Sequence, residues 1–425
     1  MSKSSEVTGF YKLTPKERLQ LVKNFAGLSD EEAALLQKSG SLPLDMADRM
    51  IENVIGVFPV PMGIAVNFLI NKRDYLIPMA IEEPSVVAAA SYAARMARDG
   101  GGFYTSSTAP VMIGQIQVVG LKDPYAAKMK VIQAKEEILR KANEQDPVLV
   151  SAGGGAKDLN AKIIDTTQGL MLIPELYVDC RDVMGANAVN TMLEAVAPMI
   201  EHITGGHVYL RIISNLAVKR LVRAWCVVPK EVVGGEEVVD GIVNASAFAA
   251  ADPFRAATHN KGILNGIIAV VLATCNDHRA IEAGAHAYAV KNGHYTSLST
   301  WEKNENGDLV GSIELPMAIG LVGGAVRTHP IAKIAVKILG VKTANELGEV
   351  LAAVGLAQNL GALRALVTEG IQRGHMALHA RNIAVMAGAT GELIDLVATK
   401  MVEERKIRMD RAKELIEQHG KAGKA

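Results

Sequence analysis

The sequence predicts an α+β protein with a large, mainly helical body, a smaller βαββαβ unit inserted into that body, and a helical segment at the C-terminal end. Three observations predict this organisation. Capping boxes and Ala- and Gly-rich apolar stretches indicate closely packed helices, strand patterns mark the stretch from 111 to 213, and charged helical patterns return after 370. We therefore expect four segments, namely the first part of the body, the insert, the second part of the body and a C-terminal appendage, at 1–109, 110–217, 218–369 and 370–425.

The N-terminal region begins with helices and continues into strands. Thr14-Pro15-Lys16-Glu17 is a capping box with Pro at the first helical position, and Ser29-Asp30-Glu31-Glu32 is a second box, with Gly40 as a natural stop. A β-rich stretch follows over 57–79. Glu82-Glu83-Pro84-Ser85 then opens an Ala-rich helix that we expect to end at Gly100.

The insert is predicted to run strand, helix, strand, strand, helix, strand. The expected ranges are 111–119, 124–143, 161–165, 170–179, 188–202 and 207–213. This order is the ferredoxin-like pattern, and it differs from the βαβαβ order of a Rossmann half.

After the insert, Ala- and Gly-rich helical patterns resume. A hairpin over 301–313, with Asn306-Gly307 as its turn, interrupts them, and long helices are expected from Pro330 to about Gly370. The remaining residues form a charged helical segment.

Composition excludes several classes of protein. Lys+Arg and Asp+Glu are 45 each, so no charge excess favours nucleic acid or a membrane surface. We expect a cytoplasmic protein without a membrane span, because no uninterrupted apolar run approaches ~18 residues. The three cysteines are Cys180, Cys226 and Cys275, whose spacing indicates neither a disulfide framework nor a zinc site.

Three charged residues could carry chemistry, and each has a plainer alternative. Glu83 is either a capping carboxylate or an acid projecting from a helix edge. Lys261 precedes an apolar run and is either a fixed cation or a lysine that extends from a helix end into solvent. Asp277 either caps the next helix or lies buried between a lysine and a second carboxylate.

Two further motifs are weak on their own. Asp182-Val183-Met184-Gly185-Ala186-Asn187 follows a predicted strand and opens a helix, where backbone amides suit a pyrophosphate. His375 and His379 share a helical face, but the spacing suggests no third ligand, so we predict no metal site. The sequence contains no GxGxxG, GxxxxGK[ST], HExxH or GxSxG motif.

Six separated segments, taken in order, resemble the class II 3-hydroxy-3-methylglutaryl-coenzyme A (HMG-CoA) reductases. They are ENVIG (52–56), EEPSVVAAAS (82–91), DVMGANAVNTM (182–192), RAATHNKGI (255–263), NDHRAIEAGAHAYA (276–289) and GIQRGHMALHARN (370–382). The resemblance covers nearly the whole chain. It departs from the family pattern at Cys275, where the family has a glycine before Asn-Asp.

The resemblance implies a role for each matching residue. The implied catalytic residues are Glu83, Lys261, Asp277 and His375; the substrate contacts are Ser85, Asn215, Arg255, Asn265, Gln358 and His379; and the cofactor contacts are Asp146, Asp182, Met184, Gly185 and Asn187. It further implies a homodimer or higher oligomer with the active site at the dimer interface. The body then binds substrate, the insert binds the nicotinamide cofactor, and the C-terminal appendage is a mobile flap.

The implied reaction is the four-electron reduction of HMG-CoA to mevalonate and CoA with two NAD(P)H, through a thiohemiacetal and mevaldehyde, or its reverse. Lys261 would stabilise negative charge on the carbonyl oxygen, His375 would protonate the CoA thiolate, and Glu83 would protonate the aldehyde. Asp277 would tie Glu83 and Lys261 together. Asp146 favours NADH over NADPH, because a carboxylate repels a 2′-phosphate. The alternatives are a non-redox CoA-thioester lyase or hydrolase, and a CoA- or nucleotide-binding protein without turnover.

Overall fold

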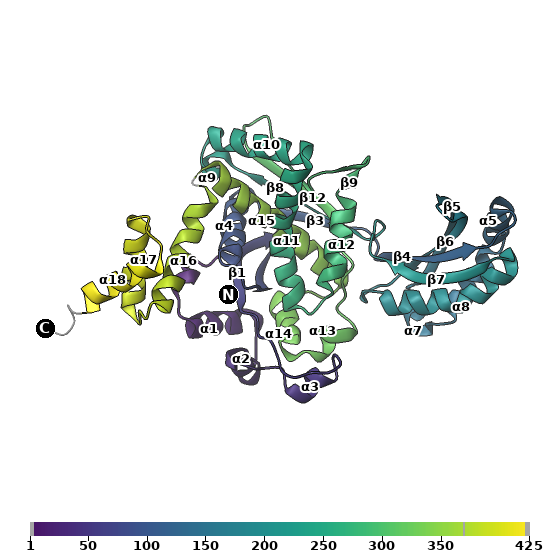
Figure 1. Ribbon diagram of the computed structural model, residues 1–425, viewed down its shortest axis with the longest axis horizontal. Coiled ribbons are helices and arrows are strands. Elements are labelled where there is room, and N and C mark those ends of the chain that lie inside the picture. Colours follow the sequence, from purple (N-terminus) through teal and green to yellow (C-terminus); the bar gives the residue numbers. More distant parts are fainter. Residues whose placement is uncertain (1–3, 369, 421–425) are drawn as a thin grey trace.

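The computed structural model describes residues 4–368 and 370–420, apart from the side chains of 371–378 and 420. Three bodies follow one another along the longest axis (Figure 1). The insert lies at one end, the C-terminal helices lie at the other, and the large body lies between them.

The large body is built on one six-stranded sheet of order β11-β12-β8-β3-β1-β2. Its strands are β1 (Met62–Ile70), β2 (Arg73–Ala80), β3 (Phe103–Ser107), β8 (Leu221–Val228), β11 (Ser299–Lys303) and β12 (Leu309–Pro316). β3 precedes the insert and β8 follows it, yet the two strands pair antiparallel over Phe103–Ser107. The chain therefore leaves and re-enters the body between neighbouring strands of one sheet.

Helices surround this sheet, and two of them cross closely at glycines. The body contains α4 (Val86–Asp99), α9 (Lys230–Val233), α10 (Glu236–Ala251), α11 (Pro253–Ala273), α12 (His278–Tyr288), α13 (Gly324–Thr328), α14 (Pro330–Leu339) and α15 (Ala344–Val367), with the short ribbon β9 (Val290–Lys291) and β10 (His294–Tyr295). A Cβ built on Gly266 of α11 would lie 2.9 Å from the Cβ of Gln358 on α15. The abundance of Gly and Ala thus serves close helix packing.

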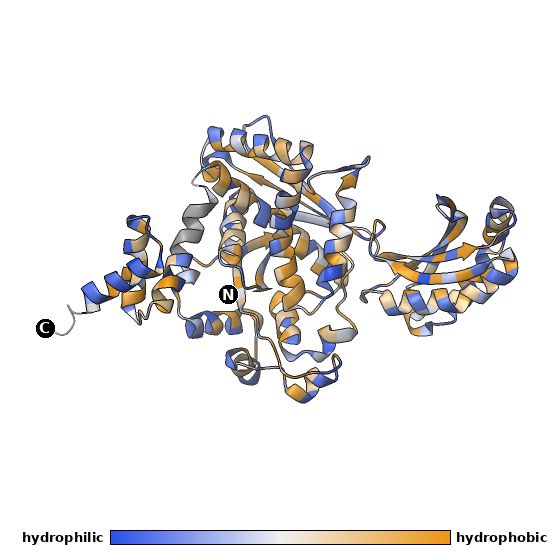
Figure 2. Cartoon of the chain, viewed as in Figure 1, coloured by the Kyte–Doolittle hydropathy of each residue, from blue (hydrophilic) through white to orange (hydrophobic). Residues whose placement is uncertain are grey.

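α15 is the one helix in the described ranges that is long and apolar enough to cross a membrane. Within its apolar window, 67% of the residues are buried inside the protein, as in a core helix. Figure 2 shows the same pattern, with hydrophobic residues concentrated in the middle of the body and many hydrophilic residues on the C-terminal helices.

The N-terminal helices follow their predicted caps. They are η1 (Phe10–Lys12), α1 (Pro15–Ala26), α2 (Asp30–Gln37) and α3 (Leu44–Asp48), and both predicted capping boxes are formed, at Thr14 and at Ser29. α2 ends at Gln37, before the predicted stop, and Gly40 instead takes a left-handed φ of 73° in the following turn.

The insert has the predicted ferredoxin-like arrangement. Its elements are β4 (Val111–Val119), α5 (Pro124–Gln133), α6 (Lys135–Asn143), α7 (Pro147–Ser151), β5 (Gly155–Thr166), β6 (Gly169–Asp179), α8 (Ala186–Thr204) and β7 (His207–Ser214). The sheet order is β5-β6-β4-β7 with every neighbouring pair antiparallel. Three details differ from the prediction: the first helix is interrupted at Ala134, the additional short helix α7 follows it, and the second strand begins at Gly155.

The C-terminal helices are α16 (Ile371–Met386), α17 (Glu392–Glu403) and α18 (Met409–Gly420). They enclose a small hydrophobic core of their own, which includes Ala384, Val397, Met401 and Leu415. Because this core is separate from that of the large body, the segment is a compact appendage.

Candidate active site

Two predicted catalytic residues meet although they lie far apart in the sequence. Glu83 stands in the turn before α4, and its Oε2 accepts a hydrogen bond from Lys261 Nζ on α11 at 2.9 Å. Asn265, one helical turn beyond Lys261, donates to the same oxygen at 3.4 Å. The Glu83 side chain is 34% exposed and that of Lys261 is 61% exposed, so both groups remain accessible to a ligand.

The turn that carries Glu83 has an unusual backbone conformation at Ser85. Ser85, the residue before α4, has a left-handed φ of 75° and provides no side-chain cap for the helix. A non-glycine residue in this region is strained, and such strain is typical of functional turns. Ser85, a predicted substrate contact, therefore presents its hydroxyl in the same turn as Glu83.

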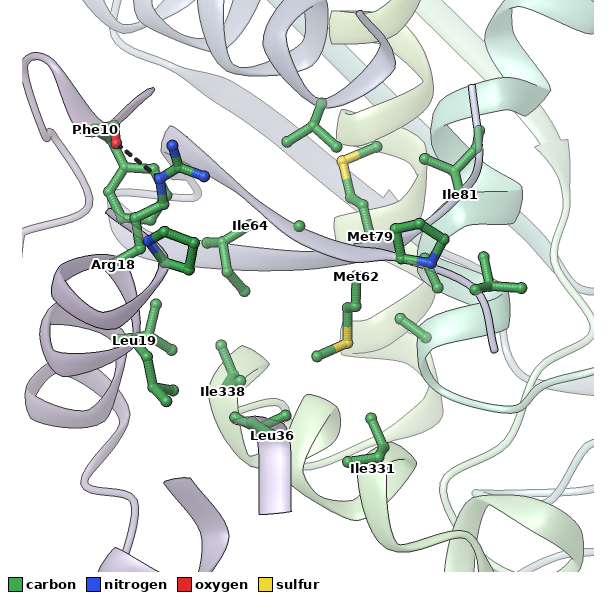
Figure 3. A pocket seen from close by; sticks show the side chains of 18 of the residues that line it. Phe10, Arg18, Leu19, Leu36, Met62, Ile64, Met79, Ile81, Ile331 and Ile338 are labelled. Carbon is green, nitrogen blue, oxygen red and sulfur yellow. Dashed lines mark hydrogen bonds between the residues drawn. The ribbon is translucent and has the colours of Figure 1, made fainter. Parts of the chain in front are cut away.

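A large pocket of about 1560 Å³ lies beside this turn, and Glu83 and Ser85 both line it. Most of its wall is apolar: in Figure 3, Met62 of β1 points toward Ile331 of α14, whereas Met79 of the paired strand β2 points to the other side of the strands. Cys275, which replaces the family's glycine, also lines the pocket. The volume exceeds that of common small-ligand sites, so the pocket suits an elongated ligand.

Asp277 caps a helix and does not meet the other two residues. Its Oδ1 accepts from the backbone N–H groups of Arg279 and Ala280 at 3.1 and 3.2 Å, and from Arg279 Nε at 3.1 Å. The hydrogen bond from Arg279 holds the pKa of Asp277 below its usual value. Among the described residues no hydrogen bond joins Asp277 to Glu83 or Lys261, so the predicted tie is not formed within one chain.

Helix geometry explains this separation. Lys261 lies 12 residues before Ala273, the last residue of α11, which corresponds to a rise of about 18 Å. Asp277 follows that end of the helix and therefore lies beyond the reach of a lysine side chain. Cys275, between the two, adopts a left-handed φ of 51°, so the loop keeps a glycine-like conformation despite its Cβ.

The predicted cofactor residues gather where β6 leads into α8. Gly185 is the N-cap of α8 with φ of 111°, and a Cβ there would lie 2.5 Å from Cys180 Sγ, so the position requires glycine. No side chain caps this helix, which leaves its first amides directed outward, and Asn187 in its first turn is exposed. This junction suits a bound phosphate group.

Two carboxylates flank the junction in structural roles. Asp182 Oδ1 accepts from the backbone N–H of Ala344 at the start of α15, at 2.7 Å. Asp146 Oδ1 accepts from Leu149 N at 2.9 Å and so caps α7. A Cβ on Gly154 would lie 2.7 Å from both Leu149 of α7 and the carbonyl oxygen of Asp179 at the end of β6, so α7 and its cap Asp146 lie close to the junction.

The remaining predicted residues have varied surroundings. Gln358 on α15 is 5% exposed, and its Oε1 has no hydrogen-bond partner among the described residues. Arg255 is half-buried on α11, whereas Asn215, between β7 and β8, and His379, on α16, are exposed. His375 belongs to α16, but its side chain lies outside the described part of the chain.

Ten of the predicted residues thus form two groups. We call Glu83, Ser85, Lys261 and Asn265 the acid–lysine half, and Asp146, Asp182, Met184, Gly185, Asn187 and Asp277 the cofactor half. The length of α15 indicates how far apart the two groups lie. Asp182 accepts a hydrogen bond from Ala344, the first residue of α15, and Gly361, 17 residues later in the same helix, packs against Ala89 of α4. This corresponds to about 25 Å of helix. Within the described ranges, no cluster of His, Cys, Asp or Glu is arranged to hold a metal ion.

Sequence reasoning did not single out two residues that connect segments of the cofactor half. Arg220 is 3% exposed and donates to the carbonyl oxygens of Val183 and Met184. Asn276 accepts from the backbone N–H of Gly320. A lone arginine after a strand carries no signal, whereas Asn276 adjoins Asp277 in a segment that matches the family.

Comparison with known proteins agrees with this geometry. The profile of the hydroxymethylglutaryl-coenzyme A reductase family matches residues 14–380. A 3-hydroxy-3-methylglutaryl-coenzyme A reductase of Archaeoglobus fulgidus is 65% identical over 97% of this chain and 94% of its own length. A probable reductase of Borreliella burgdorferi is 34% identical over 91% of this chain and 89% of its own.

Solved structures of the same family share the fold. A 3-hydroxy-3-methylglutaryl-coenzyme A reductase from Streptococcus pneumoniae superimposes with a TM-score of 0.84 at 40% identity, covering 97% of this chain and 99% of that one. A structure of the class II enzyme from the same species, bound to NADPH in open conformations, gives a TM-score of 0.83 at 42% identity, with 85% and 99% coverage. The chain therefore belongs to the hydroxymethylglutaryl-coenzyme A reductase family.

Proposed function

We propose that this chain reduces HMG-CoA to mevalonate and CoA, consuming two reduced nicotinamide cofactors. The observation that carries the proposal is the contact of Lys261 and Asn265 with Glu83, beside a large apolar pocket, in a member of this reductase family. The pocket would take the long pantetheine arm of the substrate, with the thioester near Glu83.

Two residues of the acid–lysine half, and the buried Gln358, then have distinct tasks. Lys261 Nζ stabilises the negative charge that builds on the carbonyl oxygen during reduction, where a fixed cation is most effective in a site that excludes water. Glu83, held by the same ammonium group, delivers a proton to the aldehyde oxygen in the second reduction. The buried Oε1 of Gln358 offers a hydrogen-bond acceptor to substrate.

The second proton that the overall reaction takes up is assigned to the C-terminal appendage. His375 on α16 would protonate the departing CoA thiolate, because an imidazole titrates near neutrality and a thiol near pH ~8.5. We propose that 370–425 is a flap that closes for this step and opens for release of CoA. We also propose that 110–217 binds the cofactor and that the large body binds substrate.

The cofactor half fits a dinucleotide. The uncapped N-terminus of α8 and the obligatory Gly185 form a junction that a pyrophosphate suits, with Met184 and Asn187 beside it. Bound there, the nicotinamide supplies the hydride equivalents for both reductions. We propose that NADH is preferred, because the Asp146 carboxylate accepts from a ribose 2′-OH and repels a 2′-phosphate. NADPH binding belongs to the pneumococcal protein and does not fix the preference of this chain.

Because about 25 Å of α15 separates the two halves within one chain, we infer that each active site combines the acid–lysine half of one copy with the cofactor half of another. A two-fold dimer forms two such sites from one interface. Asp277 of one copy then reaches Lys261 of the other, which restores the network that a single chain lacks. Cytoplasmic localisation stays a prediction.

Absorbance of the reduced nicotinamide tests the proposal directly. Adding HMG-CoA and NADH to the purified protein should consume two NADH for each CoA thiol released. Thiol release without NADH oxidation would instead identify a thioester lyase or hydrolase. A folded protein that neither releases the CoA thiol nor oxidises NADH would leave the proposal without support.

A further inference from the structure

A buried arginine joins the cofactor half to the large body entirely through backbone carbonyls. Arg220 Nη1 donates to the carbonyl oxygens of Val183 and Met184, both at 3.1 Å, and Nη2 donates to that of Ile319 at 2.6 Å. The side chain is 3% exposed, and none of the ion pairs among the described residues includes it. Burying a guanidinium group is costly, and three carbonyl oxygens together with the charges of Asp179 and Asp182 offset that cost here.

The peptide unit between Ile319 and Gly320 is hydrogen-bonded on both sides. Ile319 contributes the carbonyl that Arg220 binds, and Gly320 contributes the N–H of the same peptide unit, which donates to Asn276 Oδ1 at 2.8 Å. Asn276 is 9% exposed, and its Nδ2 donates to the buried Thr274 at 3.1 Å. One peptide unit is thus fixed between the arginine and the residue that immediately precedes Asp277.

Close packing reinforces these hydrogen bonds. A Cβ on Gly320 would lie 2.6 Å from the backbone nitrogen of Met184, so the peptide lies directly against the cofactor segment. The next two residues, Leu321 and Val322, donate their backbone N–H groups to the Asp182 carbonyl at 2.8 and 3.1 Å. Displacement of the Ile319–Gly320 peptide would therefore disturb the cofactor segment and the Asp277 loop together.

We propose that Arg220 and Asn276 are positioning residues of the reaction, which clamp the Ile319–Gly320 peptide and thereby fix the nicotinamide-binding segment relative to Asp277. This inference rests on the proposed function, since it assigns the cofactor to Asp182–Gly185. It adds two residues that touch neither cofactor nor substrate and act through the peptide between them. Small misplacements of reacting groups can reduce rate by up to ~10²-fold.

The test uses Arg220→Met, Asn276→Leu and the double variant in the full-length protein. Arg223→Met is the matched control, because Arg223 lies only three residues after Arg220, on β8, but forms an exposed ion pair with Glu314. We expect each single variant to lower kcat about 10- to 100-fold and to raise KM for NADH, with KM for HMG-CoA within about twofold of wild type. Since both residues act through one peptide, the double variant should lose little more than the worse single variant.

Amide hydrogen exchange in the cofactor-free protein supplies a readout apart from activity. Either substitution should speed exchange across both 317–322 and 182–185, whereas Arg223→Met should leave both segments unchanged. If the two residues had a purely structural role, their separate losses in kcat would multiply in the double variant, and KM for NADH and KM for HMG-CoA would rise equally. Either result would overturn the proposal. Wild-type kinetics and exchange in both single variants would overturn it equally.

Two further arms keep the outcome unambiguous. If Asn276→Leu or Arg220→Met fails to fold, the same double-variant comparison is made with Asn276→Asp and Arg220→Lys. Asn276→Asp keeps the acceptor oxygen, and Arg220→Lys keeps the charge but loses the second donor nitrogen of the guanidinium group. We expect Asn276→Asp to retain more activity than Arg220→Lys, and the reverse order would contradict the clamp. Wild type and Lys261→Ala are measured in the same assay, so a wild type that does not reduce HMG-CoA signals failure of the proposed function itself.

Discussion

Lys261→Ala removes the ammonium group on which the proposed chemistry depends. In the structure Nζ lies 2.9 Å from Glu83 Oε2, and the side chain is 61% exposed. An exposed ion pair contributes only about 0–1 kcal/mol to folding, so the thermal midpoint should shift by a few degrees at most. Loss of a fixed donor to a developing oxyanion costs ~10²–10³-fold in kcat, and we expect a loss of this size or larger.

The assay is NADH oxidation with HMG-CoA, accompanied by a thermal melt of each variant. Lys303→Ala is the matched control, since Lys303 also forms an ion pair at the surface, with Asp240 at 2.5 Å, but lies on β11 away from Glu83. It should keep wild-type kcat. A folded Lys261→Ala protein with near wild-type turnover would refute the assignment, and so would an equal loss in Lys303→Ala.

Three other predictions concern cofactor choice, proton delivery and pH. Wild type should have a higher kcat/KM with NADH than with NADPH, and Asp146→Ala should narrow that ratio; a wild-type preference for NADPH would contradict the role of this carboxylate. His375→Ala should impair reduction of HMG-CoA far more than reduction of free mevaldehyde, which expels no thiolate, whereas Glu83→Gln should impair both; equal losses for His375→Ala would exclude the leaving-group role. Burial, aided by the charge of Arg255, lowers the pKa of His259 to about 4, below its value near 6.5 in the unfolded chain. Between these two pH values the unfolded chain binds more protons than the folded chain. The free energy of unfolding should therefore fall by up to about 3 kcal/mol as pH drops through this window. His259→Asn should show a smaller drop in thermal midpoint between pH 7 and pH 5 than wild type, and an unchanged drop would show that another group is responsible.

Local signals in the sequence predicted much of the fold. The capping boxes at Thr14 and Ser29 form because each places a hydroxyl and a carboxylate within one turn of helix. The hairpin turn at Asn306-Gly307 forms because Gly307 can take a φ of 84°. By contrast, the break between α5 and α6 falls at Ala134, a residue that carries no helix-breaking signal, so tertiary packing decides it.

The candidate site was predictable in its residues and only partly in its arrangement. The contact between Glu83 and Lys261 follows from the family resemblance, and the structure places the two side chains together. Asp277 was expected beside them, although the rise of a helix over 253–273 already separates it from Lys261 by too great a distance. The clamp formed by Arg220 had no sequence signal, because its partners are backbone carbonyls from segments distant in the chain.

Subunit complementation tests the central claim, that each active site takes its acid–lysine half and its cofactor half from different copies. Lys261→Ala and Asp277→Asn chains carrying different tags are co-expressed, and mixed dimers are isolated through both tags. Each parent should be nearly inactive, whereas the mixed dimer contains one intact site and should regain about half of wild-type activity. A mixed dimer of Lys261→Ala and Glu83→Gln should regain no activity, because both changes lie in the acid–lysine half and each of the two sites then contains one of them. Mixed dimers of Lys261→Ala and Asp277→Asn that remain as inactive as their parents would contradict the claim.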